Sequence, residues 1–382
     1  MSADLITKNR FVHLDSLRGI AALAVCLYHC MIAWKGPDEL GINALLGPCS
    51  VLFFFVLSGF VLGRSLEKNP VTNIYSYLSY LVRRIFRLYP AIFITLIIFT
   101  LINLYHAPYI PLLGEHAFWY GSDNNILENC SASWILKEIF LIKVRICPVM
   151  WSLQAEFLCS FLLPLIVTLT LRNKNLYIPL LILFAFFMAP IFSGISFYYP
   201  YNLLGGSRIS YFFAFYVGYF VNKFSFCNSY INPFISKWVL VLIMLTIVPI
   251  GSCYRFFNAD FSSLQISVVI VFSVFLAIMV PCNITPLRKF LLRRPLVILG
   301  QCSYSFYLLH CVGIFFGLWI MHLWMPGTIR HPVMLPVFVL FILTLLISIP
   351  LAVAMEYVVE RPFNRWGHLL SKKIQKHLPI RQ

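Results

Sequence analysis

Long apolar segments, separated by short polar stretches, follow one another along the chain between residues 16 and 356. Most are about 18–22 residues long, the length at which an α-helix crosses the hydrocarbon core of a bilayer. We predict about ten transmembrane helices on this basis, at residues 16–34, 44–63, 86–105, 150–171, 176–193, 208–222, 237–254, 264–281, 298–322 and 333–356. The pattern therefore predicts an all-α, polytopic integral membrane protein.

The composition supports this class and argues against a soluble protein. Hydrophobic residues make up 60% of the 382 residues and charged residues only 11%, whereas a soluble domain carries about 25% charged residues. The net charge is +16, but the basic residues lie in short runs between apolar segments, as topology signals and lipid contacts do, so we expect no nucleic-acid partner. Most runs fall on one predicted face, which predicts cytoplasmic termini and a basic cytoplasmic tail at 372–382 that rests on anionic lipid.

The most informative segment is Leu14–Cys30, in which charged residues precede an apolar run that contains a histidine. Asp15, Arg18 and His29 share one helix face, and the rise from Arg18 to His29 is about 16 Å, roughly half a bilayer. Ionisable side chains in membrane helices are costly and usually face a protein interior or a wet cavity, so we expect the helices to surround a central cavity. The alternative is a buried histidine that only tethers two helices.

A second candidate site begins with three arginines in the segment Leu81–Pro90. Arg84 and Arg87 share a helix face at the expected cytoplasmic end of a span. Their guanidinium groups suit phosphate, so a phosphate-bearing cofactor such as coenzyme A would fit there. A plain topology signal is the competing interpretation. At the end of the segment Phe53–Phe60, Gly59 permits a close approach or a turn, and Ser58 can satisfy freed backbone groups. Ordinary packing of small residues is the alternative.

Three further ionisable groups lie in or near predicted spans. Glu156 is about 9 Å into its helix and needs a partner, for which His29 and Arg18 are candidates; a structural ion pair is the alternative. His310 alone is more typical of a packed, hydrogen-bonded histidine than of a catalyst. Pro362 is expected to end the last membrane helix. In the long outer loop from His106 to Val149, the stretch 133–144 has the pattern of a short amphipathic helix.

Together, these segments resemble acyltransferase family 3, the integral-membrane O-acyltransferases of bacterial surface glycans. The matching stretches cover nearly the whole chain in the family's order, and they read LDSLRGIAALAVCLYH, FFFVLSGF, RRIFRLYP, WSLQAEF, YSFYLLH and EYVVERP. The resemblance implies one transmembrane acyltransferase domain over residues 1–382. We expect no extra soluble hydrolase-like domain of the kind that some members of the family carry, so the membrane part would perform the transfer or hand acyl groups to another protein.

The resemblance also implies a mechanism. Acetyl-CoA would dock from the cytoplasm, and its acyl group would cross to a hydroxyl of a cell-surface or lipid-linked saccharide at a bacterial inner membrane. His29 would act as general base or carry the acyl group transiently. The candidate catalytic residues are Asp15, Arg18, His29 and Glu156. The candidate cofactor-binding residues are Ser58, Arg84, Arg87 and Tyr89. We expect no metal, and a homodimer is compatible with the sequence.

Two functions from other classes compete with acyl transfer. Ten spans with buried His and Glu would also suit a transporter or flippase of a glycan or small solute, although the two halves of the chain show no matching Gly/Pro-broken helices. A non-catalytic scaffold for other membrane enzymes would leave the buried charges of three motifs unexplained.

Overall fold

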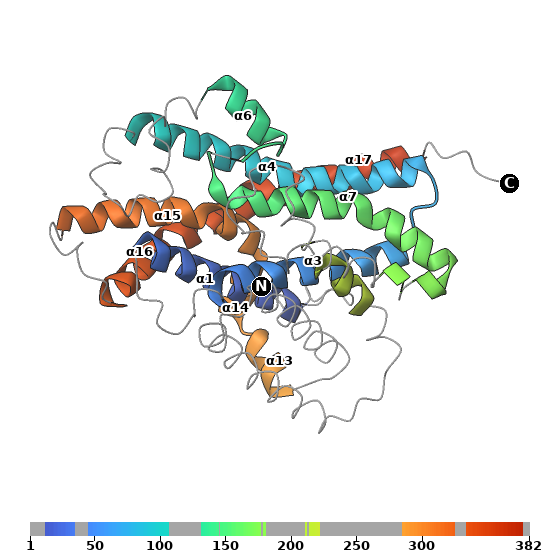
Figure 1. The fold of residues 1–382 in the computed structure, drawn as a ribbon, viewed down its shortest axis with the longest axis horizontal. Coiled ribbons are helices and arrows are strands. Elements are labelled where there is room, and N and C mark those ends of the chain that lie inside the picture. Colours follow the sequence, from blue (N-terminus) through green and yellow to red (C-terminus); the bar gives the residue numbers. More distant parts are fainter. Residues whose placement is uncertain are drawn as a thin grey trace.

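The computed structural model describes the chain at residues 12–34, 45–106, 131–144, 146–176, 179–180, 211, 214–221, 285–324 and 334–376. These residues form helices and no strand, which confirms the all-α prediction (Figure 1). The helices of membrane-spanning length are α1 (Val12–Ala33), α3 (Ser50–Lys68), α4 (Ile74–His106), α7 (Trp151–Arg172), α15 (Ser303–Trp324) and α16 (Met334–Met355). The shorter elements are η2 (Leu45–Cys49), α6 (Ala132–Ile139), η4 (Pro148–Met150), η5 (Lys174–Leu176), α13 (Thr285–Leu291), α14 (Arg294–Gln301), η8 (Glu356–Glu360) and α17 (Arg361–Lys376).

Six helices among the described residues are long and apolar enough to cross a membrane. They match the spans predicted at 16–34, 44–63, 86–105, 150–171, 298–322 and 333–356. The prediction at 208–222 is described in part, as a helical segment at 214–221. The spans at 176–193, 237–254 and 264–281 lie almost wholly outside the described residues. The total of about ten, and their arrangement around a central cavity, therefore stay predictions.

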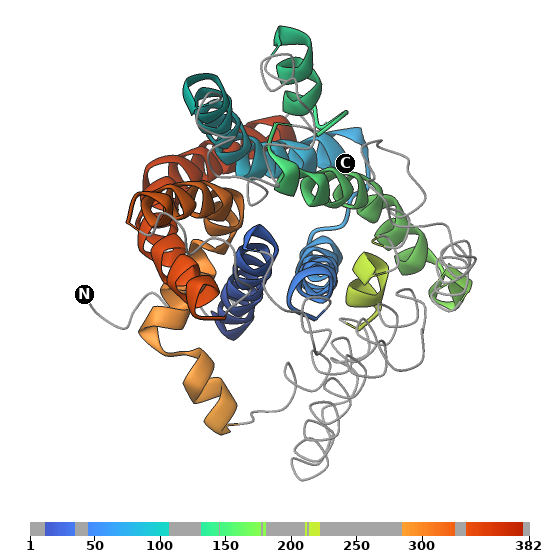
Figure 2. The ribbon, with the colours of Figure 1, turned by 60° about the vertical axis from the view of Figure 1, so that its left-hand side comes forward.

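Helix α1 lies at the centre of the bundle, in contact with α3, α14, α15 and α16 (Figure 2). Small residues allow α1 to pack closely against α14. Gly19 of α1 faces Gly300 of α14, and a Cβ on Gly19 would lie 2.9 Å from the backbone nitrogen of Gly300. The helices can approach so closely because neither glycine carries a side chain. The first turns of α1, with Asp15 and Arg18, are thereby held beside the start of α15.

Helix α4 begins twelve residues before the predicted span, at Ile74. Its N-terminus is capped, because the backbone N–H of Ser76 donates to Asn73 Oδ1 at 2.9 Å. The added turns pack along α17, where Arg83 Nη1 donates to Ser371 Oγ at 3.3 Å. The contact continues at Phe86, whose ring lies 6.4 Å from that of Phe363. The paired helices α4 and α17 lie side by side in Figure 1.

The prediction that Pro362 ends the last helix is wrong. The chain passes from α16 through the π-helical turn η8 directly into α17, and Pro362 is the second residue of α17. A proline is tolerated in the first turn of a helix because its missing N–H would have no intrahelical partner there. Single π-turns are rare and are often found at functional sites, and η8 carries Glu356 and Glu360.

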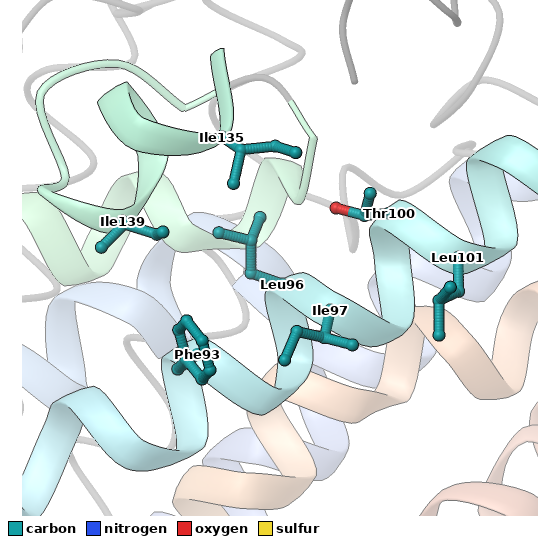
Figure 3. A pocket seen from close by; sticks show the side chains of 7 residues that line it. All are labelled: Phe93, Leu96, Ile97, Thr100, Leu101, Ile135 and Ile139. Carbon is teal, nitrogen blue, oxygen red and sulfur yellow. The ribbon is translucent and has the colours of Figure 1, made fainter. Parts of the chain in front are cut away.

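The short helix predicted at 133–144 is present as α6, which lies against α4, but it covers only Ala132–Ile139. Figure 3 shows Ile135 and Ile139 of α6 directed toward Phe93, Leu96 and other α4 side chains around an apolar cavity of about 130 Å³. The turn after α6 is fixed by Glu138, which is fully buried. Its two carboxylate oxygens accept the backbone N–H groups of residues 146 and 147, each at 2.7 Å.

Gly59 serves helix packing, the simpler of its two predicted roles. A Cβ at this position would overlap the backbone carbonyl oxygen of Phe215, and a Cβ on Gly63 would overlap the ring of Tyr219. On the facing segment, Gly218 approaches the backbone of Val56 in the same way. Small residues spaced by four therefore let α3 and the helical segment 214–221 touch along their backbones.

Candidate functional site

A cavity of about 820 Å³ opens among the first turns of α1 and α7, the length of α3, the first half of α4, the end of α14, the start of α15, and the η8–α17 junction. Its lining includes seven Lys or Arg side chains and four Asp or Glu side chains, a net charge of +3 with His368 neutral. These charged residues are Arg18, Arg64, Lys68, Arg83, Arg84, Arg87, Arg361, Asp15, Glu156, Glu356 and Glu360. The cavity is therefore suited to an anionic ligand.

Arg84 is the most buried cation of this lining, with 6% of its surface exposed. Its Nη2 donates to Glu156 Oε1 at 3.0 Å and to Ser160 Oγ at 2.7 Å. Its Nε is also buried and has no hydrogen-bond partner among the described residues. A buried guanidinium donor without a partner is costly, so Arg84 is the cation of the lining that would gain most from a further acceptor.

The partner of Glu156 differs from the two that the sequence suggested. Neither His29 nor Arg18 pairs with it; the carboxylate contacts Arg84 and accepts a longer hydrogen bond of 3.4 Å from Ser58 Oγ. Glu156 thus connects two residues predicted to bind the cofactor. The helix register explains the pairing, because α7 runs beside the first half of α4 and brings Ser160 and Glu156, one turn apart, opposite Arg84.

Arg18 and Asp15 line the same cavity, and Arg18 Nη1 lies 3.6 Å from Asp15 Oδ1. The structure therefore places these two predicted catalytic residues with Arg84 and Arg87, in the cationic cavity. Arg87 is exposed, and its side chain also lines the cavity. Tyr89 is not part of the lining, and its ring packs edge-on against Phe157 at 5.7 Å.

His29 forms a second, buried centre with His310. The Nδ1 atom of His29 lies 2.6 Å from Nε2 of His310, and the two rings are parallel within 4°. His310 is completely buried, and His29 is 9% exposed. The other nitrogen of His310, Nδ1, lies 2.6 Å from the backbone carbonyl oxygen of Tyr307. The predicted tether between two helices is thus present, between α1 and α15, and it is made by two imidazoles.

The hydrogen bonds of this pair assign the protons. A carbonyl oxygen can only accept, so the proton of neutral His310 is on Nδ1 and its Nε2 is the acceptor. The proton between the rings must then come from His29 Nδ1. Nε2 of His29 consequently carries no proton, which is the state in which an imidazole nitrogen can act as a base.

Cys311 completes a group of three donor atoms that lie within 4.8 Å of one another. Its Sγ is 3.5 Å from His310 Nε2. Two nitrogen ligands of one tetrahedral zinc, each about 2.0 Å from the metal, would be about 3.3 Å apart. The observed 2.6 Å between the histidine nitrogens is shorter, so the present arrangement is that of a hydrogen bond rather than of a ligand set.

Tyr307 lies between the cavity and the histidine pair. Its side chain lines the cavity, and its hydroxyl lies 2.8 Å from Ser152 Oγ and donates to the carbonyl of Val149 at 3.2 Å. Its own carbonyl accepts from His310. His29 and His310 do not line the cavity themselves. The cationic cavity and the histidine pair therefore meet at one residue of α15.

Sequence reasoning did not identify the roles of Tyr307, Ser152 and Glu360. Glu360 is 4% exposed, lines the cavity and accepts a short hydrogen bond from Ser305 Oγ. One usable signal was present for α15: Tyr307 and His310 are three residues apart, so a helix places them on one face. The pairing of His310 with His29, which is 281 positions away, has no local signal.

Comparison with known proteins agrees with the motifs. The family model described as an acyltransferase domain matches residues 11–353. This range includes the histidine pair and the lining of the cationic cavity, apart from the lining residues of η8 and α17. No curated protein and no solved structure matches the chain. The chain therefore belongs to acyltransferase family 3 and is a membrane acyltransferase.

Proposed function

We propose that the protein transfers an acyl group, most simply acetyl, from acyl-CoA on the cytoplasmic side to a hydroxyl of a cell-surface or lipid-linked saccharide on the other side of a bacterial inner membrane. The observation that supports this best is the contact at Tyr307 between a cationic cavity and a buried imidazole pair. In this orientation both termini are cytoplasmic, as the distribution of basic residues favours.

The donor fits the cavity by charge. Coenzyme A carries phosphates, and the lining offers the buried Nε of Arg84, the exposed Arg87 and the guanidinium of Arg18. Guanidinium groups bind phosphate through charge-assisted hydrogen bonds. With its phosphates at these arginines, the thioester end of the donor extends toward Tyr307 and Ser152, the residues of the lining nearest the histidines.

The transfer itself needs a base for the acceptor hydroxyl. His29 Nε2 takes the hydroxyl proton while the hydroxyl oxygen attacks the thioester carbonyl carbon. The carbon–sulfur bond then breaks, the ester forms, and the coenzyme A thiolate leaves as the thiol after receiving the proton from His29. The alternative, in which His29 carries the acyl group transiently, has the same products and needs the same unprotonated nitrogen.

The test uses purified protein, labelled acetyl-CoA and a glycan acceptor. We expect labelled ester with the wild type and a loss of about 10²–10⁴-fold in rate with His29→Ala. His13→Ala is a matched control, because His13 is also a buried histidine of α1 and does not line the cavity. Full transfer by His29→Ala would overturn the role of His29. Movement of the acceptor across the membrane without ester formation would support a transporter instead.

A further inference from the structure

We propose that His310 is a positioning residue that, through the Tyr307 carbonyl, holds His29 in the tautomer with the proton on Nδ1, so that Nε2 is the nitrogen that acts on the acceptor. This inference rests on the proposed function for its catalytic consequence. The assignment of the His29 tautomer does not depend on that function, because it follows from the two hydrogen bonds of His310.

The hydrogen-bond chain has only one consistent direction for neutral rings. Tyr307 offers a carbonyl oxygen, which accepts from His310 Nδ1–H at 2.6 Å. His310 Nε2 is therefore an acceptor and receives the Nδ1 proton of His29, also at 2.6 Å. The groups around the nitrogens of His310 are a carbonyl, an imidazole and the thiol of Cys311, all neutral. A charged His310 would therefore be buried without an anion, at substantial cost.

The positions of the two rings make this direction hard to reverse. His310 is fully buried and follows Tyr307 by three residues in α15, so the carbonyl that it contacts is fixed by the helix itself. His29 is on the central helix α1, which is packed against α15. The carbonyl thus determines the tautomer of His310, and His310 determines that of His29. The hydrogen bond made by one imidazole nitrogen sets the protonation of the other, so His310 sets the state of His29 Nε2.

Two substitutions separate this role from simple packing. His310→Gln keeps a side chain with an acceptor oxygen for His29 and a donor amide for the Tyr307 carbonyl. His310→Leu keeps the apolar volume but removes both. We expect His310→Leu to lower kcat by about 10²–10³-fold, because in most molecules Nε2 of His29 would then carry a proton and could not act as a base. We expect His310→Gln to restore at least about a tenth of the wild-type kcat, and the KM for acyl-CoA to change less than about twofold in both, since His310 does not line the cavity.

The direct measurement is the ¹⁵N spectrum of the histidine rings of the purified full chain in nanodiscs. The His29 signals are assigned by their loss in His29→Asn. We expect a protonated Nδ1 and an unprotonated Nε2 on His29 in the wild type and in His310→Gln, and a shift toward the Nε2–H tautomer in His310→Leu. His322→Leu, a substitution of another α15 histidine, is the matched control and should leave the His29 signals unchanged.

The outcomes distinguish this proposal from the proposed function. If no variant or wild-type protein forms ester, the acyltransfer proposal fails, whereas the spectrum still tests the tautomer. An unchanged His29 tautomer in His310→Leu, or full kcat in that variant, would overturn the positioning role. So would one bound metal ion per chain that is lost in His310→Leu, because both nitrogens would then be ligands rather than hydrogen-bond partners.

Discussion

Substitution of Arg84 by glutamine should weaken the binding of coenzyme A strongly. The Nε of Arg84 is a buried donor without a partner among the described residues, and it belongs to a side chain that lines the cationic cavity. A hydrogen bond from a charged group to a ligand contributes about 1.5–3 kcal/mol. Because each 1.4 kcal/mol is a factor of ten, Arg84→Gln should raise the Kd about 10- to 150-fold.

The exposed Arg87 gives the internal comparison. It lines the same cavity but is open to solvent, where ion pairs contribute about 0.2–1 kcal/mol and are screened by salt. Arg87→Gln should therefore raise the Kd at most about fivefold at physiological ionic strength, with a larger effect at low salt. Arg172→Gln, at the end of α7 and outside the cavity lining, removes the same charge and should leave the Kd unchanged.

The assay is calorimetric titration of coenzyme A into protein in nanodiscs at two salt concentrations, after thermal unfolding shows that each variant is folded. One complication is that Arg84→Gln also leaves Glu156 without its ion-pair partner, and that carboxylate would repel phosphate. The double variant Arg84→Gln/Glu156→Gln removes the repulsion. Binding should stay at least about tenfold weaker in the double variant. Recovery of wild-type affinity would refute the direct contact, because Arg84 would then serve only to neutralise Glu156.

Two predictions concern packing and stability. Gly59→Ala should lower the free energy of unfolding by about 1–3 kcal/mol, although alanine favours a helix by about 1 kcal/mol, because the new Cβ would overlap the carbonyl of Phe215. An unchanged or higher melting temperature in detergent would contradict this contact. Glu138→Gln should weaken the turn after α6 by about 1.5–3 kcal/mol, because an amide offers one acceptor to the two backbone N–H groups that the carboxylate binds. Equal rates of limited proteolysis within 131–144 would contradict the role of Glu138.

The membrane helices could be predicted because the length of an apolar run is a local property. The early start of α4 was missed for a physical reason: Arg83 and Arg84 lower the hydropathy of turns that are nonetheless helical and packed on α17. The local signal was the cap at Asn73, which hydropathy does not measure. The continuation through Pro362 depends on a π-turn, which apolar periodicity does not detect.

The sequence singled out most of the charged residues that the structure brings together, but not their pairings. The spacing of Arg18 and His29 gave the shared helix face, yet their separation along α1 puts one in the cationic cavity and the other beside His310. Glu156 needed a partner, and the choice of Arg84 depends on how α7 lies against α4. Such pairings join positions far apart in the chain, so they follow from helix packing rather than from any local pattern.

The most direct test of transfer from the cavity to a His29-dependent site across the membrane is a sided assay in proteoliposomes. Labelled acetyl-CoA is supplied only to the face that carries the cationic cavity, and the saccharide acceptor is trapped on the opposite face. We expect labelled ester on the trapped acceptor with the wild type and none above background with His29→Ala. Ester that forms only when donor and acceptor share one face, or ester formation that is unchanged in His29→Ala, would contradict the account.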